Sequence, residues 1–351
     1  MADIGAARPA GLVARLDEGP VICAEGYLFE LERRGYLQAG AFVPEVVLDH
    51  PEAVVQLHRE FVQAGSDVVE ALTYYAHRDK LRIIGKEHLL EEMNRQALRI
   101  AGQVASETGT LLAGDLSNTN VYIGDEQTKK AARAMFEEQV GWAVDAGVDF
   151  IIAETISYYE EALLALQAIK GAGVPAVITL AAHQDPRTRD GLTPAEACKR
   201  LEDAGADVVG LNCSRGPRTM LPLLREIRQA VRGHMAALPV PYRTTEAEPT
   251  FQSLREHGDV AVPGGMPFPT ALDPFTCSRY EIAEFGKDAY ALGVRYLGVC
   301  CGAGPHHIRA LAEALGKQPP ASRYSADMSR HSFFGTDSGL KKENQEYARR
   351  L

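Results

Sequence analysis

Three cysteines lie where apolar segments of the sequence end. Cys213 falls within Gly-Leu-Asn-Cys-Ser (210–214), and Cys300 and Cys301 are adjacent in Gly-Val-Cys-Cys-Gly (298–302). Three thiolates can hold a zinc ion that keeps its fourth position open, which is typical of catalytic zinc. A thiol that enters this position binds as a thiolate, because the metal lowers its pKa. The pattern favours a zinc-activated sulfur nucleophile, and three inert buried thiols are the alternative.

Other cysteines and histidines fit the zinc hypothesis less well. Cys23 lies in an expected strand and Cys198 in an expected helix, so we interpret both as packing residues. Cys277 has no partner at metal-ligand spacing. His306 and His307 open the last expected helix, and we interpret them as helix-start or surface residues, since three thiolates and one substrate already complete a tetrahedron.

Charge and composition exclude several classes of protein. The 351 residues carry a formal net charge of −10, which disfavours nonspecific binding to nucleic acid. No apolar run is long enough to span a membrane, and residues 1–9 lack the pattern of an export signal. We therefore expect a cytoplasmic protein whose six cysteines remain thiols and whose partners are small molecules, and homo-oligomerisation stays open.

Four copies of one local pattern indicate parallel strands. A helical stretch ends in a small residue and glycine, and an apolar segment follows, as in Asp-Ala-Gly-Val-Asp-Phe-Ile-Ile (145–152). Continuous apolar segments are typical of strands that are covered on both faces. The full set of expected strands lies near residues 20–26, 67–75, 110–117, 148–155, 174–182, 206–213, 239–245 and 294–301.

Eight strands that alternate with helices predict an α/β fold, a single-domain (β/α)₈ TIM barrel. The clearest expected helices are 89–107, 129–146, 159–170, 195–204, 221–232 and 280–292. A doubly wound open sheet is disfavoured because no glycine-rich phosphate loop follows the first strand. Chemistry in such a barrel lies at the carboxyl ends of the strands. Those ends carry Glu25, Tyr75, Asp115, Glu154, His183, Cys213, Cys300 and Cys301.

Two segments depart from this alternation. Residues 246–278 form a long connection rich in proline and glycine, and such connections are usually functional or disordered. We expect this connection to cover the site. Residues 1–317 are predicted to form the barrel domain, and residues 318–351 a polar carboxyl-terminal extension.

Beyond these patterns, the sequence resembles the homocysteine S-methyltransferase family, and most closely its betaine-dependent members. The resemblance is carried by the two cysteine motifs, by Leu-Glu-Arg-Arg-Gly-Tyr (31–36) and by His-Pro-Glu-Ala-Val-Val (50–55), and it covers roughly residues 20–315. It implies a (β/α)₈ barrel in which Cys213, Cys300 and Cys301 bind zinc. It further implies that the sulfur of homocysteine attacks a methyl group of an onium donor, which gives methionine.

The resemblance also implies substrate-binding residues. Glu154 matches the family's acidic residue for the homocysteine ammonium group, and Asn212 lies in the first cysteine motif. The family's first strand ends in Asp-Gly-Gly, whereas this chain has Ala24, Glu25 and Gly26. Either Glu25 supplies the missing carboxylate from one position along, or the amino-acid end of the acceptor is bound differently.

The expected site for the donor differs more strongly from the family. Phe42 stands where a tryptophan is expected, Tyr75 keeps its tyrosine, and Thr155 replaces another tyrosine, so the aromatic cage for a quaternary ammonium is weakened. Asp115 and His183 stand where less polar residues are expected. We therefore expect the donor to be a betaine, a sulfonium or another small onium compound.

Two other functions remain as alternatives. A zinc-dependent lyase would use the same three thiolates on a carbonyl substrate. A non-catalytic sensor of an amino acid or a betaine would account for the altered end of the first strand. Three intact zinc ligands argue against the sensor, since a sensor has no need of an activated thiolate.

Overall fold

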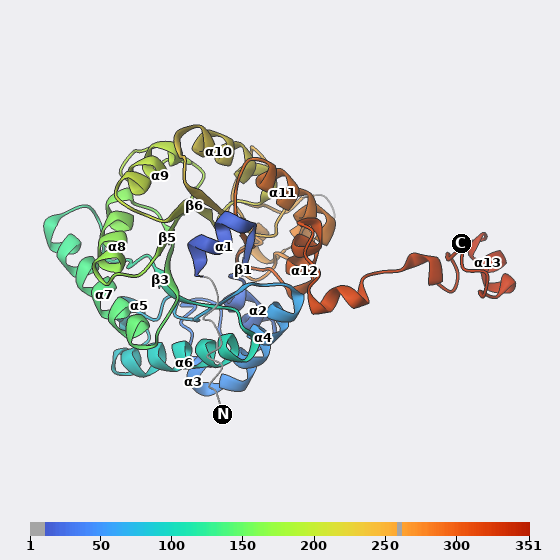
Figure 1. Ribbon diagram of the computed structural model, residues 1–351, viewed down its shortest axis with the longest axis horizontal. Helices are drawn as coiled ribbons and strands as arrows, with labels where there is room; N and C mark the ends of the chain where they lie inside the picture. The colour runs from blue at the N-terminus through green and yellow to red at the C-terminus, as the bar shows by residue number, and fades with distance from the viewer. Residues whose placement is uncertain (1–10, 258–261) are drawn as a thin grey trace, which may run out of the picture.

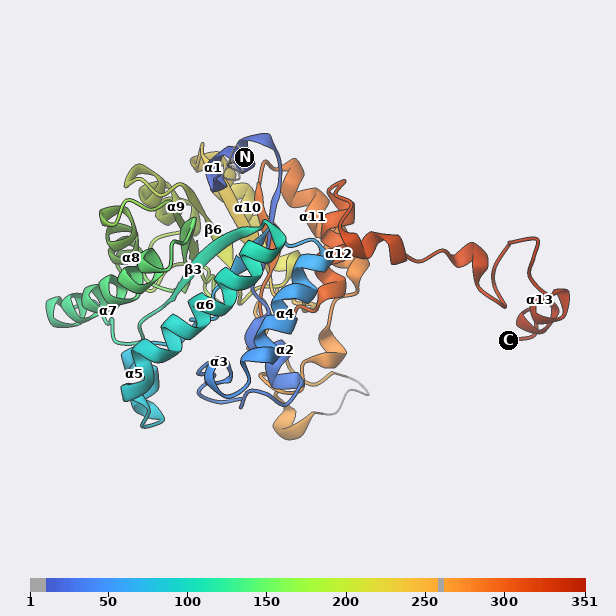
Figure 2. The ribbon, with the colours of Figure 1, turned by 60° about the horizontal axis from the view of Figure 1, so that its bottom comes forward.

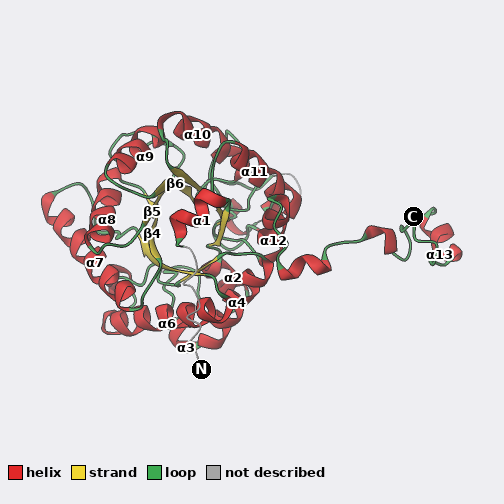
Figure 3. Ribbon diagram, viewed as in Figure 1, coloured by secondary structure: helices red, strands yellow, loops and turns green. Residues whose placement is uncertain are grey.

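A closed barrel of eight parallel strands forms the centre of the computed structural model, which describes residues 11–257 and 262–351 (Figures 1 and 3). The strands pair in chain order, and β8 closes the barrel on β1. Their bounds are β1 (Val21–Ala24), β2 (Val68–Glu70), β3 (Leu111–Ser117), β4 (Phe150–Ile156), β5 (Ala176–Leu180), β6 (Val208–Asn212), β7 (His234–Leu238) and β8 (Tyr296–Val299). The predicted TIM barrel is confirmed. Residues 1–10, for which no export signal is predicted, and residues 258–261 of the long connection lie outside the described residues.

Helices surround the barrel as an outer layer (Figure 1). The α-helices are α1 (Leu12–Glu18), α2 (Tyr27–Arg33), α3 (Val46–Asp49), α4 (Pro51–Ala64), α5 (Arg78–Ile83), α6 (Leu90–Thr108), α7 (Glu126–Asp145), α8 (Tyr159–Gly171), α9 (Pro194–Asp203), α10 (Pro217–Ala230), α11 (Arg279–Ala291), α12 (Pro305–Ala314) and α13 (Lys342–Ala348). Short 3₁₀ turns are η1 (Glu87–Leu89), η2 (Pro263–Gly265), η3 (Asp273–Phe275), η4 (Pro320–Tyr324) and η5 (Met328–Arg330). No helix among the described residues is long and apolar enough to cross a membrane.

The barrel interior is a packed core of its own. Its side chains come from all eight strands and include Val21, Phe150 and Tyr296, and the rings of Phe150 and Tyr296 meet edge to face at 6.2 Å. Helix α1 covers one end of the barrel, where Leu12 and Leu16 join this core and are each 1% exposed (Figure 1). The end of the barrel opposite the strand carboxyl termini is therefore closed by apolar packing.

Strand β7 lies earlier in the sequence than predicted. The expected strand near 239–245 was wrong, since β7 spans His234–Leu238 and pairs with β6 and β8. Pro239 and Pro241 lack the N–H that a central strand must donate, so the ladder ends before them. The strand itself was missed because His234 and two alanines make it less apolar and less β-branched than its neighbours.

A second apolar core lies above the carboxyl ends of the strands. Phe251, Leu254, Leu272 and Phe275 of the long connection pack with Tyr242, and the same cluster contains Cys213 and Cys300. The N–H of Phe251 also donates to the carbonyl of Ser214 at 2.8 Å. The described parts of residues 246–278 thus cover the cysteines, as expected from the sequence. We refer to this cluster as the rim core.

The carboxyl-terminal extension leaves the barrel. Turn η4 contacts α4 and α12, and the chain then runs outward to α13 (Figures 1 and 2). Phe333 packs on Tyr347 at 6.0 Å within the extension, while Tyr324 and Leu351 are exposed. The domain boundary at 317/318 stays a prediction.

Candidate metal centre and active site

The three predicted cysteine ligands converge. The sulfur atoms of Cys213, Cys300 and Cys301 all lie within 4.8 Å of one another, and Cys300 Sγ and Cys301 Sγ are 3.8 Å apart. A tetrahedral zinc ion with Zn–S bonds of about 2.3 Å requires sulfur separations of about 3.8 Å. Thiolate donors are also the soft ligands that favour zinc over magnesium or calcium. The three residues therefore fit a zinc ion in both geometry and chemistry.

Strand β7 brings the cysteines together although they follow β6 and β8. The N–H of Cys213 donates to the carbonyl of Leu238, and the N–H of Cys300 donates to the carbonyl of Pro239, both at 2.9 Å. These two carbonyl groups come directly from the end of β7. The thiols are thus positioned by the backbone of the intervening strand.

A glycine shapes the turn that follows the paired cysteines. Gly302 has φ of 94°, and a Cβ atom there would lie 2.0 Å from the hydroxyl of Tyr242. Arg33 of α2 holds the same turn, since its guanidinium donates to the carbonyl of Gly302 at 3.0 Å and to the Tyr242 hydroxyl at 2.9 Å. Contacts with Tyr242 and Arg33 therefore hold the turn that directs the two adjacent thiols to one point.

Hydrogen bonds among the three thiols shift their pKa values. Hydrogen bonds from Cys300 and Cys301 lower the pKa of Cys213 well below its usual value. Burial, followed by these same hydrogen bonds to Cys213, raises the pKa of Cys300, and the hydrogen bond to Cys213 raises that of Cys301. The thiolate form of Cys213 is thus favoured, and a metal ion bound by all three sulfurs would displace the remaining protons.

Asn212 links two buried carboxyl groups below the cysteines. Its amide nitrogen donates to Glu25 Oε2 at 3.2 Å, to Glu154 Oε2, and to the hydroxyl of Thr155 at 2.9 Å. The side-chain oxygen of Asn212 accepts the N–H of Thr155 at 2.8 Å. Asn212 is fully buried, and Glu25 and Glu154 are 7% and 5% exposed. The amide therefore holds both carboxyl groups at the same side of the site.

Burial raises the pKa of both carboxyl groups. Burial, followed by repulsion from Cys213, raises the pKa of Glu154 to about 8. Burial and the negative charge of Glu154 also raise the pKa of Glu25 well above its usual value. A cation that binds beside such a carboxyl group favours its charged form. Glu25 and Glu154 are thus suited to bind a cationic group.

Strained backbone marks several predicted site residues. Six non-glycine residues among those described have positive φ, a conformation that is costly for side chains with a Cβ and that clusters at functional sites. They are Phe42, Tyr75, Asn120, Thr155, Cys213 and Ser214. Thr155 is the least expected because it is β-branched, and its φ is 58°. This strain is a structural signal that the sequence motifs do not carry.

The aromatic residues expected to bind the donor lie at the rim without forming a closed cage. Phe42 packs on the rim core and stacks on Phe29 at 5.3 Å. The ring of Tyr75 contacts Tyr74 at 4.3 Å, and the Lys80 ammonium nitrogen lies 4.0 Å from the centroid of the Tyr75 ring. One face of this tyrosine is therefore engaged by a cation of the protein itself.

His183 occupies the edge of the site. Its Nε2 lies 2.8 Å from the hydroxyl of Ser157, and its carbonyl accepts a hydrogen bond from Arg215 at 2.6 Å. Burial, followed by the charge of Arg189, lowers the pKa of His183. A neutral imidazole results, and its predicted contact with substrate stays a prediction.

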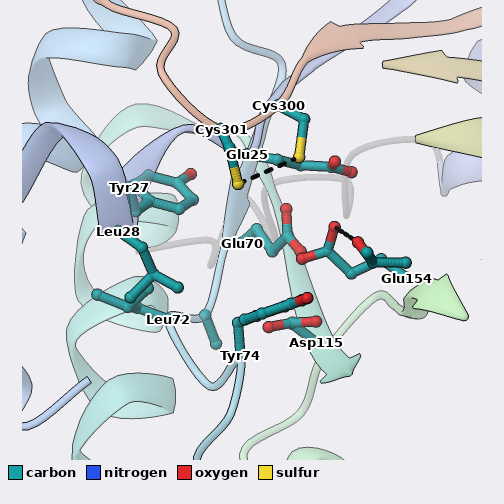
Figure 4. A pocket seen from close by; sticks show the side chains of 12 residues that line it. Glu25, Tyr27, Leu28, Glu70, Leu72, Tyr74, Asp115, Glu154, Cys300 and Cys301 are labelled. Carbon is teal, nitrogen blue, oxygen red and sulfur yellow. Dashed lines mark hydrogen bonds between the residues drawn. The ribbon is translucent and has the colours of Figure 1, made fainter. Parts of the chain in front are cut away.

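A small cavity is lined by the paired cysteines and by several acidic side chains (Figure 4). Six of the predicted site residues line it: Glu25, Asp115, Glu154, Thr155, Cys300 and Cys301. The other six do not line it: Gly26, Phe42, Tyr75, His183, Asn212 and Cys213. Gly26 instead packs against the last barrel loop, where an added Cβ would lie 2.6 Å from the carbonyl of Ala303.

Sequence reasoning missed one acidic residue of this cavity. Glu70 ends β2, is 2% exposed and accepts a hydrogen bond from the thiol of Cys23 at 3.5 Å. The signal for it was present in Asp-Val-Val-Glu (67–70), where an acidic residue follows an apolar strand directly. Cys23 itself packs in the barrel interior, as predicted.

Fold and site together define a class of protein: a (β/α)₈ barrel enzyme with a three-thiol centre on its catalytic rim. Comparison with known families is more specific. The model of the homocysteine S-methyltransferase family matches residues 23–315, and the chain belongs to this family. The family resemblance predicted from the sequence is confirmed, and the protein is a methyltransferase of this family.

Individual relatives agree with the family. Betaine–homocysteine S-methyltransferase 1 of Xenopus tropicalis is 36% identical over 99% of this chain and 85% of its own length. S-methylmethionine–homocysteine S-methyltransferase BHMT2 of Mus musculus is 34% identical over 99% of this chain and 92% of its own. The metallated form of the homocysteine methyltransferase MmuM from Escherichia coli has a TM-score of 0.66 at 18% identity and covers 86% of this chain and 98% of that chain. This last likeness shows the shared barrel.

Proposed function

We propose that the protein transfers a methyl group from a small onium donor to the sulfur of homocysteine, with zinc as its cofactor and methionine as the product. The observation that carries the proposal is the convergence of three cysteine sulfurs within 4.8 Å at the carboxyl rim of the barrel. Cys213, Cys300 and Cys301 would hold the zinc ion. When bound, zinc supplies the positive charge that keeps the acceptor thiol deprotonated at neutral pH.

The protein's own groups would bind the amino-acid end of the acceptor. Glu25 and Glu154 stand together beside the cysteines, and Asn212 orients both of them. A carboxylate paired with an ammonium group in a partly closed site forms a strong, directional hydrogen bond. Glu25 would thus replace the aspartate that this chain lacks at position 24. Its carboxylate would hold homocysteine in an orientation in which the homocysteine sulfur faces the donor.

Methyl transfer from an onium compound needs positioning more than acid–base chemistry. The sulfur attacks the methyl carbon, the carbon–onium bond breaks, and its electron pair stays on the departing nitrogen or sulfur. Phe42, Tyr75 and Thr155 would border the donor, and the rim core would exclude water while the reacting atoms align. The relatives named above use betaine or S-methylmethionine by their names, and both are onium compounds.

The decisive experiment combines metal analysis with a methyl-transfer assay. Purified protein is expected to contain one zinc per chain and to form methionine from homocysteine with at least one donor among betaines and sulfonium compounds. Cys213→Ser and Cys301→Ser are expected to lose both zinc and activity, whereas Cys198→Ser, at a buried cysteine of α9, keeps both. Full turnover after removal of all metal would overturn the proposal.

The acceptor can be tested apart from the donor. In cobalt-substituted protein, homocysteine is expected to add a thiolate-to-cobalt charge-transfer band, because a fourth sulfur joins the metal. A lyase acting on a carbonyl substrate would show no such band with homocysteine. The expected cytoplasmic location and the restriction to small-molecule partners belong to the same proposal.

A further inference from the structure

Four carboxyl groups meet beneath the three cysteines. Oxygen atoms of Glu70, Asp115 and Glu154 all lie within 4.8 Å of one another, and Glu25 adjoins this group through Glu154. The four residues come from the ends of β1 to β4 and are at most 7% exposed. Figure 4 shows the carboxyl groups of Glu70 and Glu154 directed toward each other, with Asp115 nearby. Isolated buried carboxylates are costly, so such a group needs a partner.

The described part of the chain supplies no cationic partner for these carboxyl groups. Within residues 11–257 and 262–351, no lysine or arginine forms an ion pair with any of the four carboxyl groups, although the described chain has ion pairs at many other positions. Three oxygen atoms have no hydrogen-bond partner there: Glu25 Oε1, Glu70 Oε1 and Asp115 Oδ1. Unpartnered oxygens in side chains that are more than nine-tenths buried indicate a missing ligand.

The size and chemistry of the cavity select the kind of ligand. The space open to a water-sized group is about 20 Å³, and one water needs about 10–15 Å³. This room suits a single ion. Carboxylate oxygens are the ligands of hard divalent cations such as Mg²⁺ and Mn²⁺, whereas the thiols above suit zinc.

We propose that Glu70, Asp115 and Glu154 form a second metal site, which binds one hard divalent cation beneath the cysteine centre. The cation takes the unpartnered oxygens of Glu70 and Asp115 as ligands and balances the charge of the group. Burial, followed by the charges of the neighbouring carboxyl groups, raises the pKa of Glu70 and of Asp115, and a bound cation would favour their charged forms. The site shares Glu154 with the proposed binding of the homocysteine ammonium group, so metal binding is measured in the absence of homocysteine.

Binding of Mn²⁺ to the zinc-loaded protein tests the site directly. With zinc on the cysteines, titration followed by electron paramagnetic resonance is expected to show one bound Mn²⁺ per chain. Glu70→Gln and Asp115→Asn are each expected to weaken Mn²⁺ binding at least tenfold while zinc stays at one per chain. Glu284→Gln, at an exposed position of α11, is the matched control and is expected to bind Mn²⁺ like the wild type.

Thermal unfolding gives a second readout. Mg²⁺ is expected to raise the Tm of the wild type and of Glu284→Gln, because a ligand of the folded state stabilises it. It is expected to leave the Tm of the Asp115→Asn variant unchanged.

Two results would overturn the proposal. One is a wild-type protein that binds neither Mn²⁺ nor Mg²⁺ at millimolar concentration, which decides the question even if a variant fails to fold. The other is Mn²⁺ binding that Glu70→Gln and Asp115→Asn leave unchanged. If no metal binds and Glu70→Gln instead weakens homocysteine binding, these carboxyl groups recognise an organic ammonium group and not a metal.

Discussion

His58 is a buried histidine of α4 whose ring nitrogens have no hydrogen-bond partner in the described part of the chain. The ring is 1% exposed and packs edge to face on Tyr27 at 4.8 Å. Burial lowers the pKa of His58 from 6.5 to about 3. The folded state therefore keeps this imidazole neutral, whereas the unfolded chain takes up a proton below pH 6.5.

This difference predicts a loss of stability in mild acid. Between pH 6.5 and 3 the unfolded state binds more protons at His58 than the folded state, so the free energy of unfolding falls as the pH falls. From pH 7.5 to pH 5.0 the His58 contribution is about 2 kcal/mol. His58→Leu removes this contribution, and denaturant unfolding at the two pH values measures it. An equal loss in wild type and variant would contradict the prediction.

At the scale of single residues, the sequence indicated which three thiols come together better than it indicated their surroundings. Cys213, Cys300 and Cys301 were recognisable because two motifs place thiols directly after apolar strands. Glu70 was missed, since it ends a three-residue strand and belongs to no motif. The hydrogen bonds of Asn212 to two carboxyl groups were also beyond the sequence, because they join residues 58 and 187 positions apart.

At the scale of elements, the turn between β8 and α12 sets where the two adjacent thiols lie relative to Cys213. Gly302→Ala is expected to lower the free energy of unfolding by about 2–4 kcal/mol, since it combines a left-handed backbone with overpacking against Tyr242. It is also expected to weaken zinc binding, because the turn must shift to admit the methyl group. Denaturant unfolding and a zinc competition assay measure the two effects.

Gly316 provides the control for this substitution. It has φ of 81°, but an added Cβ would meet no atom within 4 Å. Gly316→Ala is therefore expected to cost only about 1 kcal/mol and to leave zinc affinity unchanged. Equal effects of the two substitutions would mean that contact with Tyr242 is unimportant.

Element positions were predictable where periodicity and glycine agreed. The repeated helix–glycine–strand pattern marked four strands, and the full set of apolar segments placed seven of the eight near their observed positions. Helical periodicity placed α6 and α8 within a residue of their observed bounds. Strand β7 failed because its position in the sequence is set by pairing with β6 and β8, while its own residues have little β propensity. Hydrogen bonds to β6 and β8, which are distant from β7 in the sequence, stabilise a strand that the residues of β7 do not predict by themselves.

At the scale of the whole molecule, helix α1 and the cysteines lie at opposite ends of the barrel. Leu16 closes the end away from the cysteines and is 1% exposed. Leu16→Ala is expected to lower the free energy of unfolding by about 2–5 kcal/mol through cavity formation. Zinc content and the KM of the folded enzyme are expected to stay unchanged. Val13→Ala, on the exposed face of the same helix, is the control, and a changed KM in Leu16→Ala would contradict the separation.

The carboxyl-terminal extension provides a test of domain organisation. Residues up to Ser325 contact the barrel, since η4 packs on α4 and α12 and Ser325 bonds to Glu313. Removal of residues 326–351 is therefore expected to leave the Tm of the barrel within about 1 °C, because surface changes away from packed contacts cost little. A fall of several degrees would show that the extension stabilises the barrel. Light scattering on both forms shows whether the extension holds copies of the chain together.

The rim core and the interior core share no residues, so substrate preference can evolve in one while the other is conserved. Phe251, Leu254, Leu272 and Phe275 pack over the cysteines without entering the barrel interior. Selection can therefore alter residues 246–278 to admit a new donor while the buried strand residues remain under their own constraints. Homologues that share the interior but differ in this connection are the natural candidates for a different substrate preference, and exchange of the connection between them is a direct route to engineered specificity.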